Sequence, residues 1–115
     1  MIFTLGTILV NSIPSYVLFD SGATHSFLSS RFVAQHQIPL ENMPEEWSIA
    51  TGGGSVICSK VCRGCPVIVG NRKFLSDLIV IGNSAFDIIL GMDWLVFTYA
   101  TIDCRAKKVI FRMPG

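Results

Sequence analysis

Charged side chains are scarce in this sequence, and neither sign is in excess. Nine Lys and Arg stand against eight Asp and Glu in 115 residues, so the net charge is +1 and only 15% of the residues are charged, where soluble domains average about 25%. This balance excludes the basic surface that binds nucleic acid or anionic membranes, and we expect neither as a partner. Because half of the residues are hydrophobic, we expect a second chain to cover part of the apolar surface.

A long uninterrupted hydrophobic run is also missing. Residues 1–19 carry no charge, but Gly6, Asn11 and Pro14 interrupt them. Neither a basic start nor a small-residue cleavage pattern accompanies this segment, which argues against a signal peptide or a membrane anchor.

The four cysteines could form two disulfides, form one metal site or stay as free thiols, and the chain shows no sign of secretion that would favour disulfides. Cys58, Cys62 and Cys65 fall within eight residues and Cys104 lies far along the chain, so a four-cysteine zinc site is conceivable. The first interval suits a zinc knuckle poorly, and the segment alternates like a strand. Free thiols packed in or beside the core fit better, with neither metal nor cofactor, in a reducing intracellular compartment such as the cytoplasm.

Short β-rich runs bounded by turn residues dominate the chain, whose length is that of one domain. They predict an all-β, closed or sandwich-like domain with two short helices, at 26–36 and at 92–97. The strands are expected at 2–10, 16–19, 47–50, 56–61, 66–69, 73–81, 86–90, 99–103 and 109–112. Turn residues at 11–15, 51–55 and 70–71 separate the first three pairs of strands.

The densest chemical signal is the segment from Val17 to Ala23, in which Asp20 follows three apolar strand residues and precedes Ser21 and Gly22. Gly22 can turn backbone N–H groups toward the carboxylate, and Ser21 offers a hydroxyl. Taken alone, Asp-Ser-Gly is more typical of an ordinary turn than of a catalytic site. A second segment, 87–95, is an apolar strand that ends in glycine and passes into a short helix.

Other candidate sites are weaker. A cysteine nucleophile paired with His25 or His36 lacks a visible orienting partner, and we expect both histidines at the ends of the first helix. Gly52–Gly54 lacks the Lys and Ser/Thr of a phosphate-binding loop. Trp47 and Trp94 are expected to be core or edge residues.

The sequence resembles the retropepsins, specifically the aspartic protease domain of gypsy-type long-terminal-repeat retrotransposon polyproteins. The resemblance covers nearly the whole chain and rests on three ordered motifs: Leu18 to Phe27, Asp87 to Leu95, and Ile102-Asp103-Cys104 followed by Lys107-Lys108-Val109. It implies that residues 1–115 form one retropepsin-like aspartic protease domain, a small closed β-barrel-like fold that supplies half of a dimeric site.

The resemblance also implies roles for individual residues. Asp20 falls on the catalytic aspartate, Ser21 on the hydroxyl residue that links the two active-site loops, and Gly22 on the loop glycine. Ala23 falls on the adjoining substrate-binding position. The tip of the flap, the hairpin that closes over substrate, falls on Thr51, Gly52, Gly53, Gly54 and Ser55. Gly91 falls on a close-packing position beside the active-site loop.

The sequence departs from the retroviral pattern at three positions. Ser21 stands where many retroviral enzymes have Thr, which keeps the hydroxyl. Thr24 and Met92 stand where they have an acid and an Arg, so the ion pair of those two residues is absent. How the dimer is braced near the active site is left open by this change.

A single Asp-Ser-Gly per chain implies a two-fold homodimer, because aspartic proteolysis needs two carboxylates that share one proton. We therefore expect an aspartic endopeptidase that cleaves extended peptides, including its own polyprotein. The alternative is a retropepsin-like dimer kept as a binding or assembly module, with weak or lost proteolysis. The intact motif favours activity, since a module without catalysis has no need for two repelling carboxylates at its axis.

Overall fold

The computed structural model describes residues 2–3, 8–51, 53–103, 105 and 108–111. In chain order its elements are β1 (Ile2–Phe3), β2 (Ile8–Val10), β3 (Ile13–Ser15), β4 (Val17–Asp20), β5 (Phe27–Ser29), α1 (Ser30–His36), β6 (Glu41–Thr51), β7 (Gly54–Val69), β8 (Arg72–Ile81), β9 (Ile88–Leu90), α2 (Met92–Phe97), β10 (Ala100–Asp103) and β11 (Lys108–Phe111). The predicted all-β class with two short helices is confirmed. Neither of these helices has the length and apolar character needed to cross a membrane.

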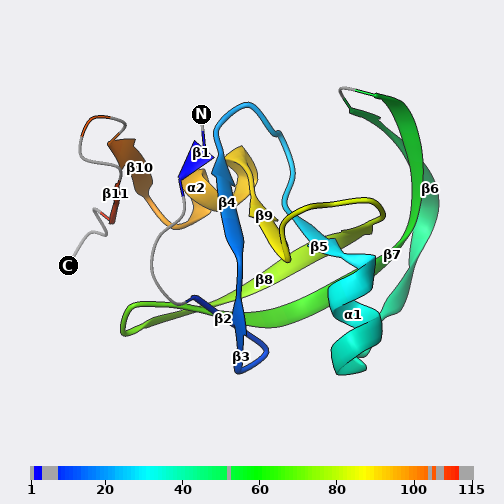
Figure 1. The fold of residues 1–115 in the computed structure, drawn as a ribbon, viewed down its shortest axis with the longest axis horizontal. Helices are drawn as coiled ribbons and strands as arrows, with labels where there is room; N and C mark the ends of the chain where they lie inside the picture. The colour runs from blue at the N-terminus through cyan, green and yellow to red at the C-terminus, as the bar shows by residue number, and fades with distance from the viewer. Residues whose placement is uncertain (1, 4–7, 52, 104, 106–107, 112–115) are drawn as a thin grey trace.

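Nine strands form the main sheet, and three of them position the candidate site. The strand order is β1-β4-β9-β5-β8-β7-β2-β3, with β6 paired to β7. Among the described residues, no hydrogen-bonded pair joins β3 back to β1 to close the sheet as a barrel. In the middle, β9 lies between β4, to which it is parallel, and β5, to which it is antiparallel. The loop from β4 to β5 must therefore pass over the end of β9 (Figure 1).

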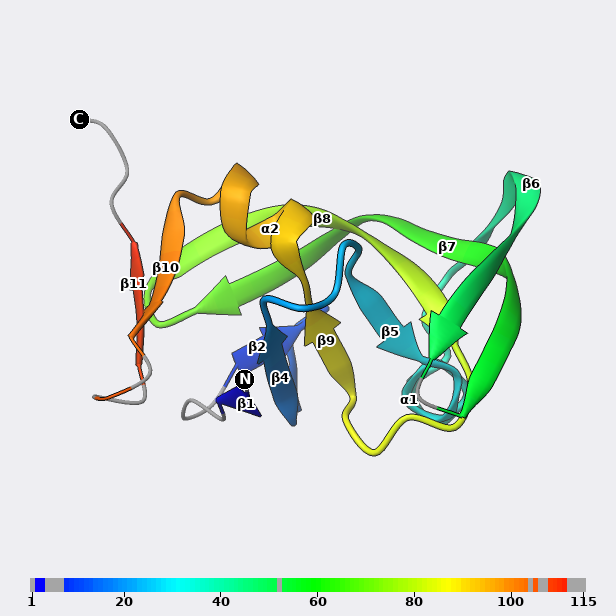
Figure 2. The same ribbon diagram turned by 90° about the horizontal axis from the view of Figure 1, so that it is seen from above.

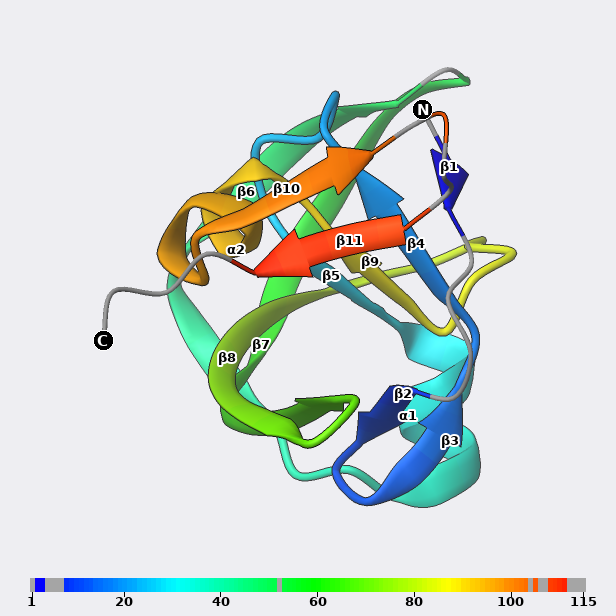
Figure 3. The ribbon, with the colours of Figure 1, turned by 90° about the vertical axis from the view of Figure 1, so that its left-hand side faces the viewer.

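Two hairpins stand at opposite ends of the molecule. The β6–β7 hairpin curves away at one end, and β10 and β11 form a separate two-stranded sheet at the other (Figures 1 and 2). Figure 3 shows β10 and β11 side by side on the end face that they cover. The end of the β6–β7 hairpin and the loop after β4 lie on the same side of the molecule, the upper side in Figure 1.

The main core is built from the central strands and α2. Val17, Leu18 and Phe19 of β4 are all buried, as expected for a strand covered on both faces. Trp94 of α2 is 3% exposed and packs against Phe74 and Phe19, with ring centroids 5.3 and 5.9 Å away. The Trp94 indole N–H donates to the Ser76 hydroxyl at 3.1 Å, which compensates for its burial. Trp94 is therefore a core residue, as predicted.

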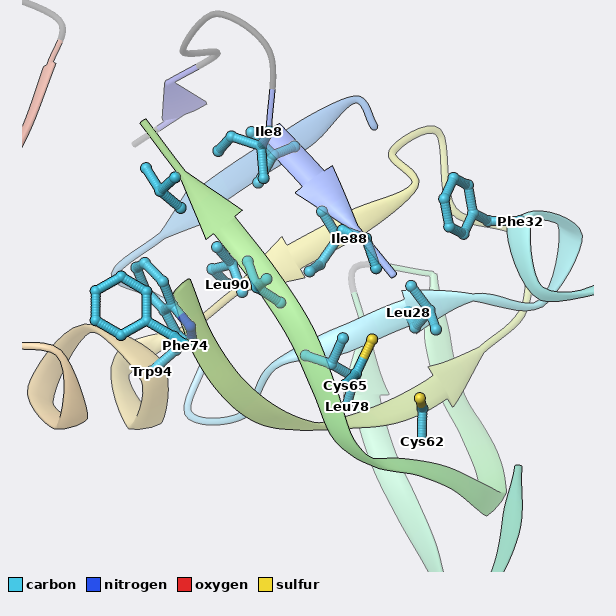
Figure 4. Close-up of a cluster of buried hydrophobic side chains, with 14 of the residues drawn as sticks. Ile8, Leu28, Phe32, Cys62, Cys65, Phe74, Leu78, Ile88, Leu90 and Trp94 are labelled. Carbon is cyan, nitrogen blue, oxygen red and sulfur yellow. The ribbon is translucent and has the colours of Figure 1, made fainter. Parts of the chain in front are cut away.

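Cys58, Cys62 and Cys65 are free and buried, as expected from the sequence. Figure 4 shows Cys62 and Cys65 on β7 within the core cluster. A hydrogen bond between these two thiols lowers the pKa of Cys62 and raises that of Cys65, and burial raises the pKa of Cys58. The fourth cysteine, Cys104, lies outside the described residues. Within the described ranges, no three His, Cys, Asp or Glu side chains gather as a metal site.

The first helix is shorter than predicted. Helix α1 begins at Ser30, and the residues expected to form its first turns, Phe27–Ser29, form β5 instead. This strand pairs with β8 on one side and β9 on the other, and a short apolar run does not distinguish such a buried strand from a helix. His36 does lie at the C-terminal end of α1, whereas His25 lies outside the helix, in the loop after β4.

One predicted turn and one predicted pair of strands also differ. The loop expected at 11–15 is a tight turn at Asn11 and Ser12, both with positive φ, and Ile13–Ser15 pair with β2 as strand β3. The strands predicted at 56–61 and 66–69 are one strand, β7, interrupted by a register shift between Cys62 and Cys65. Gly64 has a φ of 60° there, a conformation that glycine adopts without steric cost.

Candidate active site

Asp20 is the last residue of β4, and a tight turn orients its carboxylate. The Gly22 N–H donates to Asp20 Oδ1 at 2.9 Å, and the Ala23 N–H donates to the Asp20 carbonyl oxygen at 3.1 Å. A Cβ at Gly22 would lie 3.2 Å from Asp20 Oδ1, so a side chain there would press on the carboxylate. Asp20 is half-buried, while Ser21 and Gly22 are exposed. The turn thus presents the carboxylate at the surface in a fixed orientation.

Gly91, directly after β9, packs against the backbone of the loop after β4. A Cβ at Gly91 would lie 2.3 Å from the His25 carbonyl oxygen and 2.7 Å from that of Ala23, which is closer than real Cβ contacts. The Met92 N–H donates to the same Ala23 oxygen at 2.7 Å. The close-packing position predicted for Gly91 is confirmed, and it explains why a glycine must follow β9.

A buried hydroxyl connects the loop to α2. Ser26 is 2% exposed; its Oγ accepts a hydrogen bond from the Gly91 N–H at 3.0 Å and donates to Asp93 Oδ1 at 2.6 Å. Asp93 Oδ1 also accepts from the Trp94 N–H at 2.7 Å, in the first helical turn, where a carboxylate is favourable. Sequence reasoning assigned Asp93 to the start of this helix but missed Ser26, because its two partners lie at least 65 residues away.

We expect Ser26→Ala to lower the free energy of unfolding by about 2 kcal/mol, because it leaves the buried Gly91 N–H without its acceptor. Urea denaturation of the variant measures the change. Ser15→Ala is the matched control, since the Ser15 hydroxyl bonds only locally, to the Ile13 carbonyl at 2.8 Å. Equal losses in the two variants would contradict the connecting role of Ser26.

A cavity of about 670 Å³ lies between the loop after β4 and strand β6. Of the site residues predicted from the sequence, Gly22 and Ala23 line it, directly after Asp20 and Ser21. The rest of its lining is Thr24, His25 and Phe27 from the loop and β5, and Glu46, Trp47, Ser48, Ile49 and Ala50 from β6. None of these residues was assigned to the site from the sequence. For those of β6 a signal was available, because they directly precede a glycine-rich turn and so form one arm of a hairpin.

The predicted flap tip lies at the turn of the β6–β7 hairpin. Thr51 pairs with Gly54 as the last residues of the two strands, and Gly54 has a φ of 125°. A Cβ at Gly53 would meet no atom within 4 Å. Gly52 lies outside the described residues. Gly53 and Gly54 are not among the residues that line the cavity.

A second cavity, of about 400 Å³, adjoins the first. His25 and Trp47 line both cavities, and their rings meet edge to face with centroids 4.9 Å apart. The Thr24 hydroxyl is hydrogen-bonded to His25 Nδ1 at 2.9 Å. Trp47 lies on β6, an edge strand, and is 39% exposed. His25, predicted to end a helix, is therefore part of this site.

Comparison with known proteins assigns the class. A family model described as retroviral aspartyl protease matches residues 2–114, and the chain therefore belongs to this family. Two solved structures share its fold. The retroviral protease-like domain of Ddi1 from Leishmania major superimposes with a TM-score of 0.73 at 20% identity, covering 96% of this chain and 86% of that one. The EIAV protease, solved with the inhibitor HBY-793, gives 0.68 at 21% identity, covering 88% and 92%. The gypsy-type subgroup stays a prediction.

Proposed function

We propose that this protein is an aspartic endopeptidase that acts as a homodimer, with Asp20 of each copy at the two-fold axis. The observation that carries this proposal is the Asp20 carboxylate itself. It is held by the Gly22 N–H in a turn packed over Gly91, at the start of a loop that lines a large cleft. A surface turn with no catalytic role needs neither this packing nor this neighbouring cleft.

In the proposed mechanism the two Asp20 carboxylates share one proton. The ionised carboxylate takes a proton from a water molecule that attacks the peptide carbonyl, while the protonated one gives its proton to the carbonyl oxygen. The tetrahedral intermediate then collapses: the C–N bond breaks, the leaving nitrogen receives the proton taken from water, and a hydroxyl proton returns to the dyad. Ser21 offers its hydroxyl to link the two loops across the axis. Other acids of the chain are engaged elsewhere. Asp87 accepts a hydrogen bond from the Tyr16 N–H and pairs with Arg31, and Asp93 is held by Ser26.

Two features of the single chain support the dimer. Large apolar side chains on and after α2 are exposed: Met92, Val96, Phe97 and Tyr99 are between 39% and 66% accessible. The β10–β11 pair is separate from the main sheet, and isolated two-stranded sheets are only marginally stable. Members of the retropepsin family act as dimers on peptide substrates. With Met92 in place of an arginine, apolar packing is expected to brace this dimer.

The substrate is an extended peptide that lies between the loop after β4 and strand β6. Such a peptide adds main-chain hydrogen bonds to β6, and its alternate side chains enter the cleft. Phe27, Trp47 and Ile49 make much of the cleft wall apolar, so apolar residues are expected beside the cleaved bond. Processing of the polyprotein of a retrotransposon is the role that fits the resemblance to the gypsy-type domains.

The test is peptide cleavage measured against enzyme concentration. We expect peptides with apolar residues at the centre to be cleaved, a statine-type inhibitor to block turnover, and activity per chain to fall on dilution below the dimer dissociation constant. Sedimentation over the same concentrations reports the oligomeric state. Full activity from a monomer would refute the interchain site. A stable dimer without turnover would favour the binding or assembly module instead.

A further inference from the structure

The cavity beyond His25 and Trp47 differs from the main cleft in its charge. Three carboxylates line it, those of Glu45, Asp77 and Asp93, against one guanidinium, that of Arg63. With neutral His25 the lining carries three negative charges and one positive, a net charge of −2; a protonated His25 would make it −1. The main cleft has one acid in its lining, Glu46. The second cavity is therefore the more negative of the two.

The single arginine in this cavity is already shared between two acids. Arg63 Nη1 lies 3.9 Å from Asp77 Oδ2, and Arg63 Nε lies 4.0 Å from Glu41 Oε1, outside the cavity lining. Asp77 and Arg63 are both exposed, and at these distances the attraction is weakened by solvent. Arg63 thus offsets only part of the negative charge, and a further cation is favoured there.

The remaining walls of the second cavity are apolar. Met43 and Pro44 come from β6, Val61 from β7 and Ile79 from β8, and the Trp47 ring closes the side toward the main cleft. A lysine or arginine side chain matches this combination, because its aliphatic stem packs on apolar walls while its charged end reaches the carboxylates. The Trp47 ring adds an attraction for a cation at its face.

The two cavities adjoin each other, since His25 and Trp47 line both, and this arrangement fits successive side chains of one extended peptide. Side chains on the same face of a strand are about 7 Å apart, and the rings of His25 and Trp47, with centroids 4.9 Å apart, border both cavities. If a peptide places one apolar side chain in the main cleft, its next side chain on the same face passes the His25–Trp47 pair and reaches the second cavity. In a two-fold dimer the second copy repeats the arrangement on the other side of the cleaved bond.

We propose that the second cavity is a subsite for a lysine or arginine side chain of the substrate, two residues outward from an apolar side chain in the main cleft. This inference rests on the proposed peptidase function and specifies its substrate. Glu45, Asp77 and Asp93 supply the charge, and Trp47 with His25 forms the wall between the two side chains.

Binding to the Asp20→Asn protein tests the subsite without turnover. Fluorescent peptides share the same apolar residues at the centre. For each outer position in turn, three peptides are made that carry lysine, norleucine or glutamate there. The affinity of each peptide for the Asp20→Asn protein is measured by fluorescence anisotropy. Norleucine keeps the aliphatic stem and removes the charge. We expect one outer position at which lysine binds about fivefold tighter than norleucine and glutamate binds more weakly than either, with the preference falling as salt is raised.

Variants of the lining assign the preference to this cavity. In Glu45→Gln with Asp77→Asn, the ratio of lysine to norleucine affinity should fall toward one, while the norleucine peptide binds as before. Glu45→Gln alone should lower the ratio of lysine to norleucine affinity by a smaller amount. Because Glu45 is exposed, this single variant can be used if the double variant is unstable. Glu41→Gln is the matched control, because Glu41 pairs with Arg63 but does not line the cavity, and it should retain most of the preference.

Two results would overturn the subsite. One is equal binding of lysine and norleucine at every position, and the other is a lysine preference that survives in the double variant. If wild-type protein still cleaves these peptides, only the subsite is wrong. If none of the peptides is bound or cleaved, the proposed peptidase function fails, and the subsite fails with it.

Discussion

Asp20→Asn is expected to reduce peptide cleavage by roughly 10³-fold or more while the fold and the dimer remain. Asparagine has nearly the same volume as aspartate, and its amide oxygen can still accept the hydrogen bond that the Gly22 N–H makes at 2.9 Å. It cannot share a proton with its symmetry mate or take one from water. The variant also removes the repulsion between two carboxylates, so its dimer should be at least as stable as that of the wild type.

The measurement is kcat/KM for one peptide, together with the urea midpoint and the sedimentation coefficient of both proteins. Asp87→Asn is the matched control, because it makes the same chemical change at a carboxylate bonded to the Tyr16 N–H and paired with Arg31 at 3.6 Å. This control should keep wild-type activity and lose little stability. Activity of Asp20→Asn close to that of the wild type would refute the aspartic mechanism. Loss of activity in both variants would instead place the second carboxylate within the same chain, at Asp87.

Local sequence signals predicted the features that depend on neighbouring residues. Helix α2 has the predicted bounds, Met92–Phe97, because a glycine precedes it and an aspartate stands in its first turn. The turn at Gly70 and Asn71 joins β7 to β8 as expected, with Gly70 at a positive φ of 63°. The close packing of Gly91 followed from the family resemblance, and the carbonyl oxygens that lie beside it explain that requirement.

Features that depend on contacts distant in the sequence were not predictable. The segment Phe27–Ser29 is a strand only because β8 and β9 supply partners on both sides. The contact between His25 and Trp47 joins residues 22 positions apart, and it forms only because β6 folds over the loop after β4. Ser26 has no local pattern that marks it, since both hydrogen-bond partners of its hydroxyl come from the segment after β9. The motif could therefore be located from the sequence, but most of the cleft around it could not.

Gly91→Ala is expected to lower the free energy of unfolding by about 3 kcal/mol or more. The added methyl group would lie 2.3 Å from the His25 carbonyl oxygen and 2.7 Å from the Ala23 carbonyl oxygen. Both are backbone atoms, so no side chain can rotate away, and either β9 or the loop after β4 must move. The same shift would strain the 2.7 Å hydrogen bond from the Met92 N–H to Ala23 and displace the turn that orients Asp20.

Urea denaturation of Gly91→Ala measures the loss of stability, and kcat/KM of the same variant measures the effect of displacing the turn that orients Asp20. Gly82→Ala is the control, since a Cβ there would meet only the Ser30 hydroxyl, at 3.9 Å, an ordinary contact, and we expect it to change both quantities little. Gly91 supports the loop that carries Ala23, and small displacements of catalytic groups are costly. We therefore expect the folded fraction of Gly91→Ala to have a kcat/KM at least tenfold below that of the wild type. Wild-type stability of Gly91→Ala would show that the loop can move away from β9 without cost, and the rigid support of Asp20 inferred from this contact would then be wrong.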